Sequence, residues 1–241
     1  MCLEALRGQI LMSFLGRAYT TACKHLLGPA LLKSQAFLYA MKFPPYAAEV
    51  QAEVAKTYDP VRFGTIALAL ERVREIPGSL AEVGVWQGTV SRFIHRFLPD
   101  RTYYLFDTFE GFPESDLTHK DQRFRDTSVD RVKKTIGDTT NVIFRVGYFP
   151  RTAMGLENEQ FAFVMIDVDL YTPTLAALEF FYPRLVPGGY VFVHDYNSPE
   201  SEWGVSRAVN LFMRDKPEPV VEIPDKFGTV IFRRCFADST I

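Results

Sequence analysis

The stretch SLAEVGVWQGT, residues 79–89, shows most directly how this chain folds. Its first part, Ser79–Gly84, is an apolar run typical of a buried strand, and the following Thr89–Phe97 has the spacing of a helix. Two glycines, Gly84 and Gly88, stand in the turn between them. Glycine lets the backbone turn sharply and approach a ligand closely, and the start of a helix offers free N–H groups. The stretch therefore predicts a strand–turn–helix unit with a ligand site at the turn.

Outward from this unit, apolar runs alternate with helical segments, which is typical of a parallel α/β sheet. We expect parallel strands at Ser79–Gly84, Tyr103–Asp107, Val142–Val146, Phe161–Asp167 and Tyr190–His194. The other helices are expected at Val61–Arg74, Ser128–Ile136, Thr174–Tyr182 and Val205–Arg214. Asp59 and Thr172 are the expected N-caps of the first and third of these, each followed by a proline.

The last two expected strands are Val220–Ile223 and Thr229–Arg233. They are too close in sequence for a parallel crossover, which needs a dozen residues or more, so they must pair as a hairpin. The sequence thus predicts a doubly wound, mostly parallel, seven-stranded Rossmann-like α/β sheet that ends in an antiparallel β-hairpin.

An N-terminal extension precedes this pattern. Apolar residues recur at helical spacing from Ile10 to Ala18, and Pro44-Pro45 ends the helical region. We expect residues 1–60 to form a lid or an oligomer contact, such as that of a homodimer. Residues 61–241 form the expected main domain.

Composition and charge exclude several classes of protein. A net charge of −2 lacks the basic excess of a nucleic-acid surface. The cysteines, Cys2, Cys23 and Cys235, form neither a CxxC pair nor a secreted disulfide framework, which favours the cytoplasm. No signal peptide is evident, and the apolar stretch 26–43 is shorter than the roughly 20 residues that cross a bilayer. A small molecule is therefore the expected partner, rather than nucleic acid or membrane.

The turn also indicates which cofactor binds. A dinucleotide fingerprint has the form G-x-G-x-x-G, whereas this chain has G-x-x-x-G preceded by Glu82. S-adenosylmethionine (SAM) has no phosphate, and its ammonium and sulfonium groups favour a nearby carboxylate. Asp107 ends the second strand, where a carboxylate can accept both ribose hydroxyls of an adenosine in SAM or NAD enzymes alike. The alternative for the turn is that its glycines serve the backbone alone and no ligand binds there. The alternative for Asp107 is that it is only a helix N-cap or a surface residue.

Acidic residues follow the fourth and fifth strands: Asp167 and Asp169 after one, His194 and Asp195 after the other. Ligands of open α/β sheets bind outside the carboxyl ends of the strands, so these residues should face the same crevice as Gly84. Converging carboxylates repel unless a cation or a shared proton relieves them, and Mg²⁺ is a natural candidate. A metal could lower the pKa of a substrate hydroxyl; without one, His194 or an Asp could act as general base. The alternative is that Asp167 and Asp195 only cap helices.

These motifs resemble the macrocin O-methyltransferase family, class I SAM-dependent enzymes that include the mycinamicin and novobiocin sugar O-methyltransferases. The matching segments lie at 76–86, 106–113, 167–174 and 187–196, and the resemblance as a whole spans about residues 76–233. It implies SAM bound by the Glu82–Gly88 turn and Asp107, and methyl transfer to a hydroxyl of a small natural product, often a sugar. It also implies Mg²⁺ held by aspartates after the fourth and fifth strands.

The candidate cofactor-binding residues are Glu82, Gly84, Trp86, Gly88, Asp107, Thr108, Phe109, Gly147 and Asp167. The candidate catalytic residues are Asp167, Asp169 and His194, and the candidate metal ligands are Asp167, His194 and Asp195.

Two positions depart from the family pattern. His194-Asp195 stands where the family has two consecutive aspartates, and imidazole suits zinc and other transition metals better than Mg²⁺. Gln87 stands where an arginine is common. Three other functions stay open: a metal-dependent glycosyltransferase using Asp167-Val168-Asp169 as D-x-D, an NAD-dependent reductase, and a non-catalytic protein that binds SAM or a metabolite.

Overall fold

The computed structural model describes residues 54, 57–117, 121–199 and 202–236. The chain divides into two units, residues 1–60 and 61–241, and the second is described below. The predicted helical extension lies almost entirely outside the described residues, and its role as lid or oligomer contact stays a prediction.

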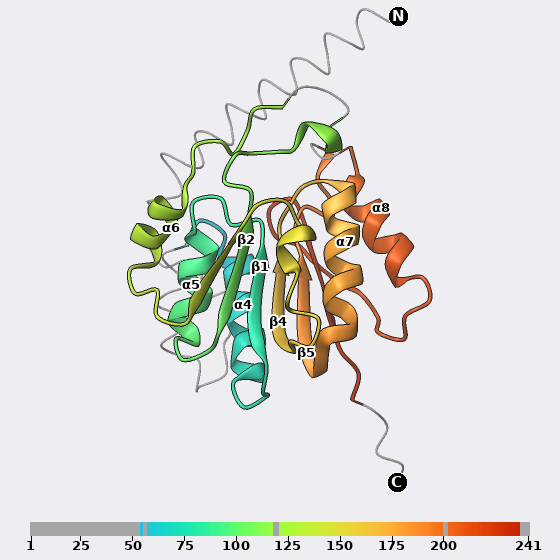
Figure 1. Cartoon of the computed structure of the whole chain (residues 1–241). Coiled ribbons are helices and arrows are strands. Elements are labelled where there is room, and N and C mark those ends of the chain that lie inside the picture. Colours follow the sequence, from blue (N-terminus) through green and yellow to red (C-terminus); the bar gives the residue numbers. More distant parts are fainter. Residues whose placement is uncertain (1–53, 55–56, 118–120, 200–201, 237–241) are drawn as a thin grey trace, which may run out of the picture. The chain divides into compact units, whose positions relative to one another are not determined.

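A seven-stranded sheet with the order β3-β2-β1-β4-β5-β7-β6 forms the centre of the second unit (Figure 1). The parallel strands are β1 (Ser79–Val83), β2 (Tyr103–Asp107), β3 (Val142–Val146), β4 (Phe161–Ile166) and β5 (Leu185–Val193). Strand β7 (Thr229–Arg233) runs antiparallel to both β5 and β6 (Val221–Ile223). The predicted mostly parallel sheet with a terminal hairpin is confirmed.

Helices cover both faces of this sheet. Helices α7 (Tyr171–Phe181) and α8 (Gly204–Met213) contribute to an apolar core with Ala81 and Val83 of β1. Glu82 points to the opposite face, where it interacts with residues of α4 (Pro60–Val73) and α5 (Thr89–Phe97). Helix α6 (Val129–Ile136) packs beside α5. The order in which successive strands are added to the sheet reverses between β1 and β4, so a crevice is expected at the carboxyl ends of these two parallel strands.

Two predicted elements begin at least three residues too late, whereas the other boundaries agree to within one residue. Strand β5 begins at Leu185 rather than Tyr190, and its pairing with β4 is irregular where Pro187 and two glycines interrupt the apolar run. Helix α7 begins at Tyr171 with Leu170 as N-cap, so Thr172 does not cap it. No helix in the described part of the chain is long and apolar enough to span a membrane.

Candidate active site at the carboxyl ends of the strands

Gly84 brings the end of β1 against the end of β4. Its φ is +87°, and a Cβ placed there would lie 1.9 Å from the carbonyl oxygen of Asp167. No side chain fits in that space, because even a methyl group would overlap the backbone. The turn after β1 is therefore fixed directly beside the acidic residues that follow β4.

Asp107 organises the same turn from the end of β2. Its Oδ2 accepts hydrogen bonds from the backbone N–H groups of Val85 at 2.7 Å and Trp86 at 2.8 Å. Its Oδ1 accepts from the N–H of Phe109 at 2.7 Å. A carboxylate has about four acceptor positions, so three are used by the protein and one remains for a ligand hydroxyl.

Residues from a later loop close over this turn. The Trp86 indole donates to Asp126 Oδ1 at 2.9 Å, and the Gln87 amide donates to Asp126 Oδ2 at 2.7 Å. The Trp86 ring also meets Phe124 edge to face, with ring centroids 5.6 Å apart. Gln87, which departs from the family pattern, therefore contributes a loop contact here.

Glu82 lies behind the turn rather than at its surface. Its side chain is buried and accepts a 2.5 Å hydrogen bond from the Tyr103 hydroxyl. Burial raises the pKa of Glu82 to about 8, although the Tyr103 hydrogen bond opposes the shift. Glu82 thus supports the turn after β1 from behind and does not present an exposed carboxylate beside it.

The remaining predicted cofactor residues also lie at strand ends. The Thr108 hydroxyl donates to the carbonyl of Gly111 at 2.8 Å, which tightens the loop after β2. The N–H of Gly147 donates to the Asp107 carbonyl at 2.9 Å. Gly88 is the N-cap of α5, with a φ of +77°. All these residues flank one edge of the sheet, as the sequence predicts.

Asp167, at the end of β4, lies between two cationic side chains. Arg62 of α4 donates from Nη2 to Asp167 Oδ2 at 2.5 Å, and His194 Nδ1 lies 3.1 Å from Asp167 Oδ1. Burial alone would raise the pKa of Asp167, but Arg62 and His194 outweigh it and hold that pKa well below its usual range. Asp167 is therefore ionised at neutral pH.

Both ring nitrogens of His194 have partners. Nδ1 is also 2.9 Å from Asp195 Oδ2, and Nε2 is 3.0 Å from the carbonyl oxygen of Lys226. Burial lowers the pKa of His194, but Asp167 and the hydrogen bonds to both aspartates outweigh it and raise that pKa to about 10. A protonated ring with both nitrogens engaged is poorly placed to act as general base.

Asp169 differs from its neighbours in having no hydrogen bond to any described residue. Burial, then the charges of Asp195 and Asp167, raises the pKa of Asp169 well above its usual range. Asp195 shows a smaller rise, caused first by burial and opposed by its hydrogen bond with His194. Asp169 is partly exposed and is the carboxyl of this cluster that is open to a further partner.

Strained backbone recurs at these strand ends. Four non-glycine residues that follow strands β1, β2, β4 and β5 have positive φ: Trp86 (46°), Phe109 (57°), Asp169 (60°) and Asp195 (61°). Each such residue costs of the order of 1–3 kcal/mol and persists only where the surroundings impose it, most often at functional sites. Five other described non-glycine residues also have positive φ, so strain accompanies the strand ends without being confined to them.

The cluster also meets the first requirement of a metal site. Asp167, His194 and Asp195 each offer one ligand atom, and these atoms lie within 4.8 Å of one another. A ligating imidazole must be neutral, so a bound cation would replace the proton on Nδ1. One nitrogen and two carboxylate oxygens suit a divalent ion.

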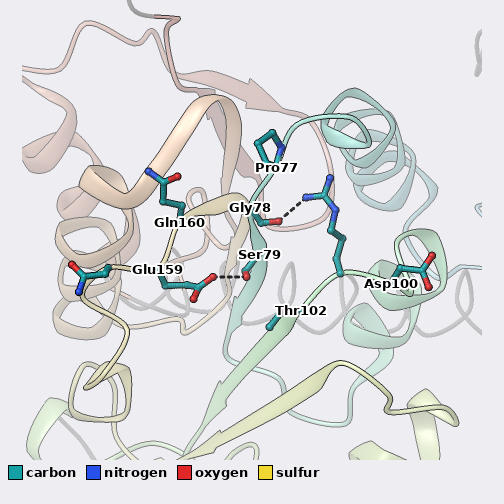
Figure 2. A pocket seen from close by; sticks show the side chains of 9 residues that line it. Pro77, Gly78, Ser79, Asp100, Thr102, Glu159 and Gln160 are labelled. Carbon is teal, nitrogen blue, oxygen red and sulfur yellow. Dashed lines mark hydrogen bonds between the residues drawn. The ribbon is translucent and has the colours of Figure 1, made fainter.

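A hollow of about 490 Å³ lies at the amino ends of β1, β2 and β4 (Figure 2). Its polar groups are paired with one another: the Ser79 hydroxyl donates to Glu159 at 2.7 Å, and Arg101 donates to the Gly78 carbonyl at 2.6 Å. Arg101 also donates to the carbonyls of Arg74 and Ile76 just after α4. These contacts stabilise the connection from α4 to β1, at the end of the strands opposite the acidic cluster.

The family model for macrocin-O-methyltransferases (TylF) matches residues 61–234. The chain belongs to this family. The match covers the sheet and every site residue named above, and it confirms the family predicted from the motifs.

Individual relatives are similar over part of their length. The chain is 32% identical over 140 residues to 8-demethyl-8-(2,3-dimethoxy-alpha-L-rhamnosyl)-tetracenomycin-C 4'-O-methyltransferase of Streptomyces olivaceus, which covers 50% of this chain and 54% of the relative. It is 30% identical over 147 residues to mycinamicin III 3''-O-methyltransferase of Micromonospora griseorubida, a match that covers 52% of this chain and 57% of the relative. The chain thus spans about half the length of the curated relatives it matches.

Among solved structures, the O-methyltransferase NovP superposes with a TM-score of 0.60 at 26% identity, covering 73% of this chain and 81% of NovP. This likeness agrees with the predicted Rossmann-like fold class.

Two residues of the site were not predicted from the sequence. Arg62 stands among apolar residues of α4, and a buried arginine needs a partner, which was the available signal. Asp126 lies in a charged loop and has no local signal that distinguishes it from a solvated residue.

Proposed function

We propose that this protein is a SAM-dependent O-methyltransferase that acts on a hydroxyl of a small natural product, with a sugar as the favoured acceptor. The observation that carries this proposal is the arrangement of one edge of the sheet. A pre-formed turn held by Asp107 adjoins an acidic cluster in which the carboxyl of Asp169 has no hydrogen bond to any described residue. The sugar preference rests on the rhamnosyl group in the name of one relative.

The turn favours SAM over a dinucleotide. The third glycine of the dinucleotide fingerprint is missing, and Gly88 at the start of α5 packs against Val132, 2.8 Å from a Cβ placed there. Asp107 Oδ1 keeps one acceptor position that a ribose hydroxyl can fill. We propose that Gly84, Trp86, Gly88, Thr108, Phe109 and Gly147 line the cofactor site, and that Glu82 positions the turn from behind.

In the proposed reaction, the acceptor oxygen attacks the methyl carbon of SAM. The new O–CH₃ bond forms as the C–S bond breaks, and the electron pair of that bond converts the sulfonium into the thioether of S-adenosylhomocysteine. The hydroxyl proton must leave, and Asp169 is the residue placed to accept it. Asp169 is partly exposed and unpartnered among the described residues, whereas both nitrogens of His194 are engaged.

We further propose a divalent metal held by Asp167, His194 and Asp195. When bound, such an ion would orient the acceptor hydroxyl and lower its pKa. Arg62 would keep Asp167 ionised and directed at the site.

The proposal also covers the N-terminal extension and the compartment in which the protein works. We propose that residues 1–60 act as a lid over the acceptor or as the contact of a homodimer, and that the protein works in the cytoplasm.

The test is turnover with methyl-labelled SAM across a panel of hydroxylated glycosides. We expect label in the acceptor and an equal amount of S-adenosylhomocysteine. Transfer of a sugar from a UDP-sugar would instead support the D-x-D glycosyltransferase, and oxidation of NADH would support a reductase. Tight SAM binding without turnover on any acceptor would favour the non-catalytic binding protein.

A further inference from the structure

His194 makes the proposed metal site chemically different from one built of carboxylates alone. Its Nδ1 lies 2.9 Å from Asp195 Oδ2 and 3.1 Å from Asp167 Oδ1. Since the ligand atoms of the three residues lie within 4.8 Å of one another, one ion can contact all three. It would do so through one nitrogen and two oxygens.

The opposite side of the imidazole is held by the hairpin between β6 and β7. Nε2 lies 3.0 Å from the carbonyl oxygen of Lys226, and a carbonyl can only accept a hydrogen bond. The hydrogen is therefore on Nε2, which leaves Nδ1 as the ligating atom of the neutral ring. A backbone carbonyl on the second ring nitrogen is the usual outer partner of a metal-bound histidine.

Asp167 has a comparable outer partner. The buried Arg62 guanidinium binds Oδ2 at 2.5 Å and leaves Oδ1 directed at His194. Ligating carboxylates are commonly oriented by such hydrogen bonds. Two of the three ligands are thus fixed in place by groups that do not themselves enter the site.

We propose that Asp167, His194 and Asp195 bind a first-row transition ion such as Co²⁺ or Zn²⁺ in preference to Mg²⁺, with His194 Nδ1 as the nitrogen ligand. Imidazole suits transition metals, whereas Mg²⁺ prefers oxygen ligands throughout. This proposal deepens the metal site of the proposed function, but it concerns binding alone and can be tested without an acceptor or SAM.

The experiment is calorimetric titration of the full chain with Co²⁺ and, separately, with Mg²⁺. The chain offers a matched control in His95, another buried histidine whose Nε2 lies 3.1 Å from a backbone carbonyl, that of Thr140. We expect His194→Asp to lower the ratio of Co²⁺ to Mg²⁺ affinity by roughly tenfold or more, which is the scale on which outer partners alone alter metal affinity. His95→Gln should leave the ratio unchanged.

Nitrogen NMR of the wild-type imidazoles provides a second readout that does not depend on folding of a variant. Saturating Co²⁺ or Zn²⁺ should change the Nδ1 signal of His194 and leave that of His95 in place. An unchanged His194 signal, or equal affinity ratios in wild type and His194→Asp, would overturn the proposal. Methyl transfer that continues in EDTA would show that turnover needs no metal, while the methyltransferase assignment itself would stand.

Discussion

The two halves of the site treat their carboxylates differently. On the β1–β2 side, Asp107 is satisfied by three backbone N–H groups and Glu82 by the Tyr103 hydroxyl. On the β4–β5 side, the carboxylates lie close enough to repel, and Asp169 has no hydrogen bond to any described residue. We infer that the first half is built to hold the shape of a cofactor site and the second to handle charge during the reaction.

The largest expected effect comes from the charge-handling half. Asp169→Asn removes the proposed base, so kcat should fall by about 10²–10⁴, the usual worth of general acid–base catalysis. SAM affinity should change little, because Asp169 lies outside the turn held by Asp107. The measurement is kcat with labelled SAM, together with SAM titration of the same variant.

Asp215→Asn is a suitable control, since Asp215 is an exposed residue paired only with Lys216 among described neighbours. Its kcat should match that of the wild type. Wild-type turnover in Asp169→Asn would remove Asp169 from the mechanism and reopen the question of which group takes the proton.

Gly84→Ala should damage the shape-holding half. The added methyl group would overlap the Asp167 carbonyl, and alanine would be strained in the left-handed conformation that Gly84 adopts. We therefore expect a loss of the order of 3 kcal/mol in stability. SAM affinity should fall as well, because the turn must move. Gly155→Ala is the control: that glycine also has a positive φ, 87°, but a Cβ there has nothing within 4 Å. If both variants melted alike, backbone strain alone would explain the loss, and the contact between β1 and β4 would have no special importance.

The positions of the acidic residues in both halves of the site could be predicted from the sequence, because these residues lie at the ends of strands. Parallel strands buried on both faces appear as apolar runs, and the residue after each run is at the carboxyl edge. Asp107 and Asp167 can be placed in this way. Strand β5 begins earlier than its apolar run predicts, because Pro187 interrupts that run within a bulge.

The hydrogen-bond partners of Asp107 and Asp167 are harder to predict from the sequence. Arg62 and Asp167 are 105 positions apart, so no local pattern connects them. Asp107 is predicted to bind the ribose, and the sequence gives no sign that three backbone N–H groups also bind its carboxylate. Hydrogen bonds from the backbone depend on loop conformation, which residue type does not specify.

Glu82→Gln should change how stability depends on pH. The pKa of Glu82 is raised from 4.5 to about 8 in the folded protein, so the unfolded chain loses this proton at lower pH than the folded one does. Wild-type stability should therefore fall, relative to the variant, as pH rises from 5 to 7, by up to about 2.7 kcal/mol at 1.36 kcal/mol per unit. Urea unfolding of both proteins between pH 5 and 7 isolates the contribution of Glu82 to the free energy of unfolding, because the two proteins share all other titratable groups. Parallel pH profiles would show that Glu82 is ionised in the folded state.

A smaller effect is expected for Asp107→Ala. SAM binding should weaken by about 2 kcal/mol, roughly thirtyfold, because hydrogen bonds to a charged group are worth 1.5–3 kcal/mol. The turn also loses its acceptor for Val85 and Trp86, so Asp107→Asn, which keeps an acceptor oxygen, should lose less. Equal SAM affinity in wild type and both variants would contradict the assignment of the β1–β2 half to the cofactor.

The central claim, a SAM site at the turn between β1 and α5, is tested most directly by calorimetric titration of the full chain with SAM and, in parallel, with NADH. We expect one SAM per chain with a dissociation constant in the micromolar range, about −8 kcal/mol, and no heat from NADH. Heat from NADH without heat from SAM would contradict the account.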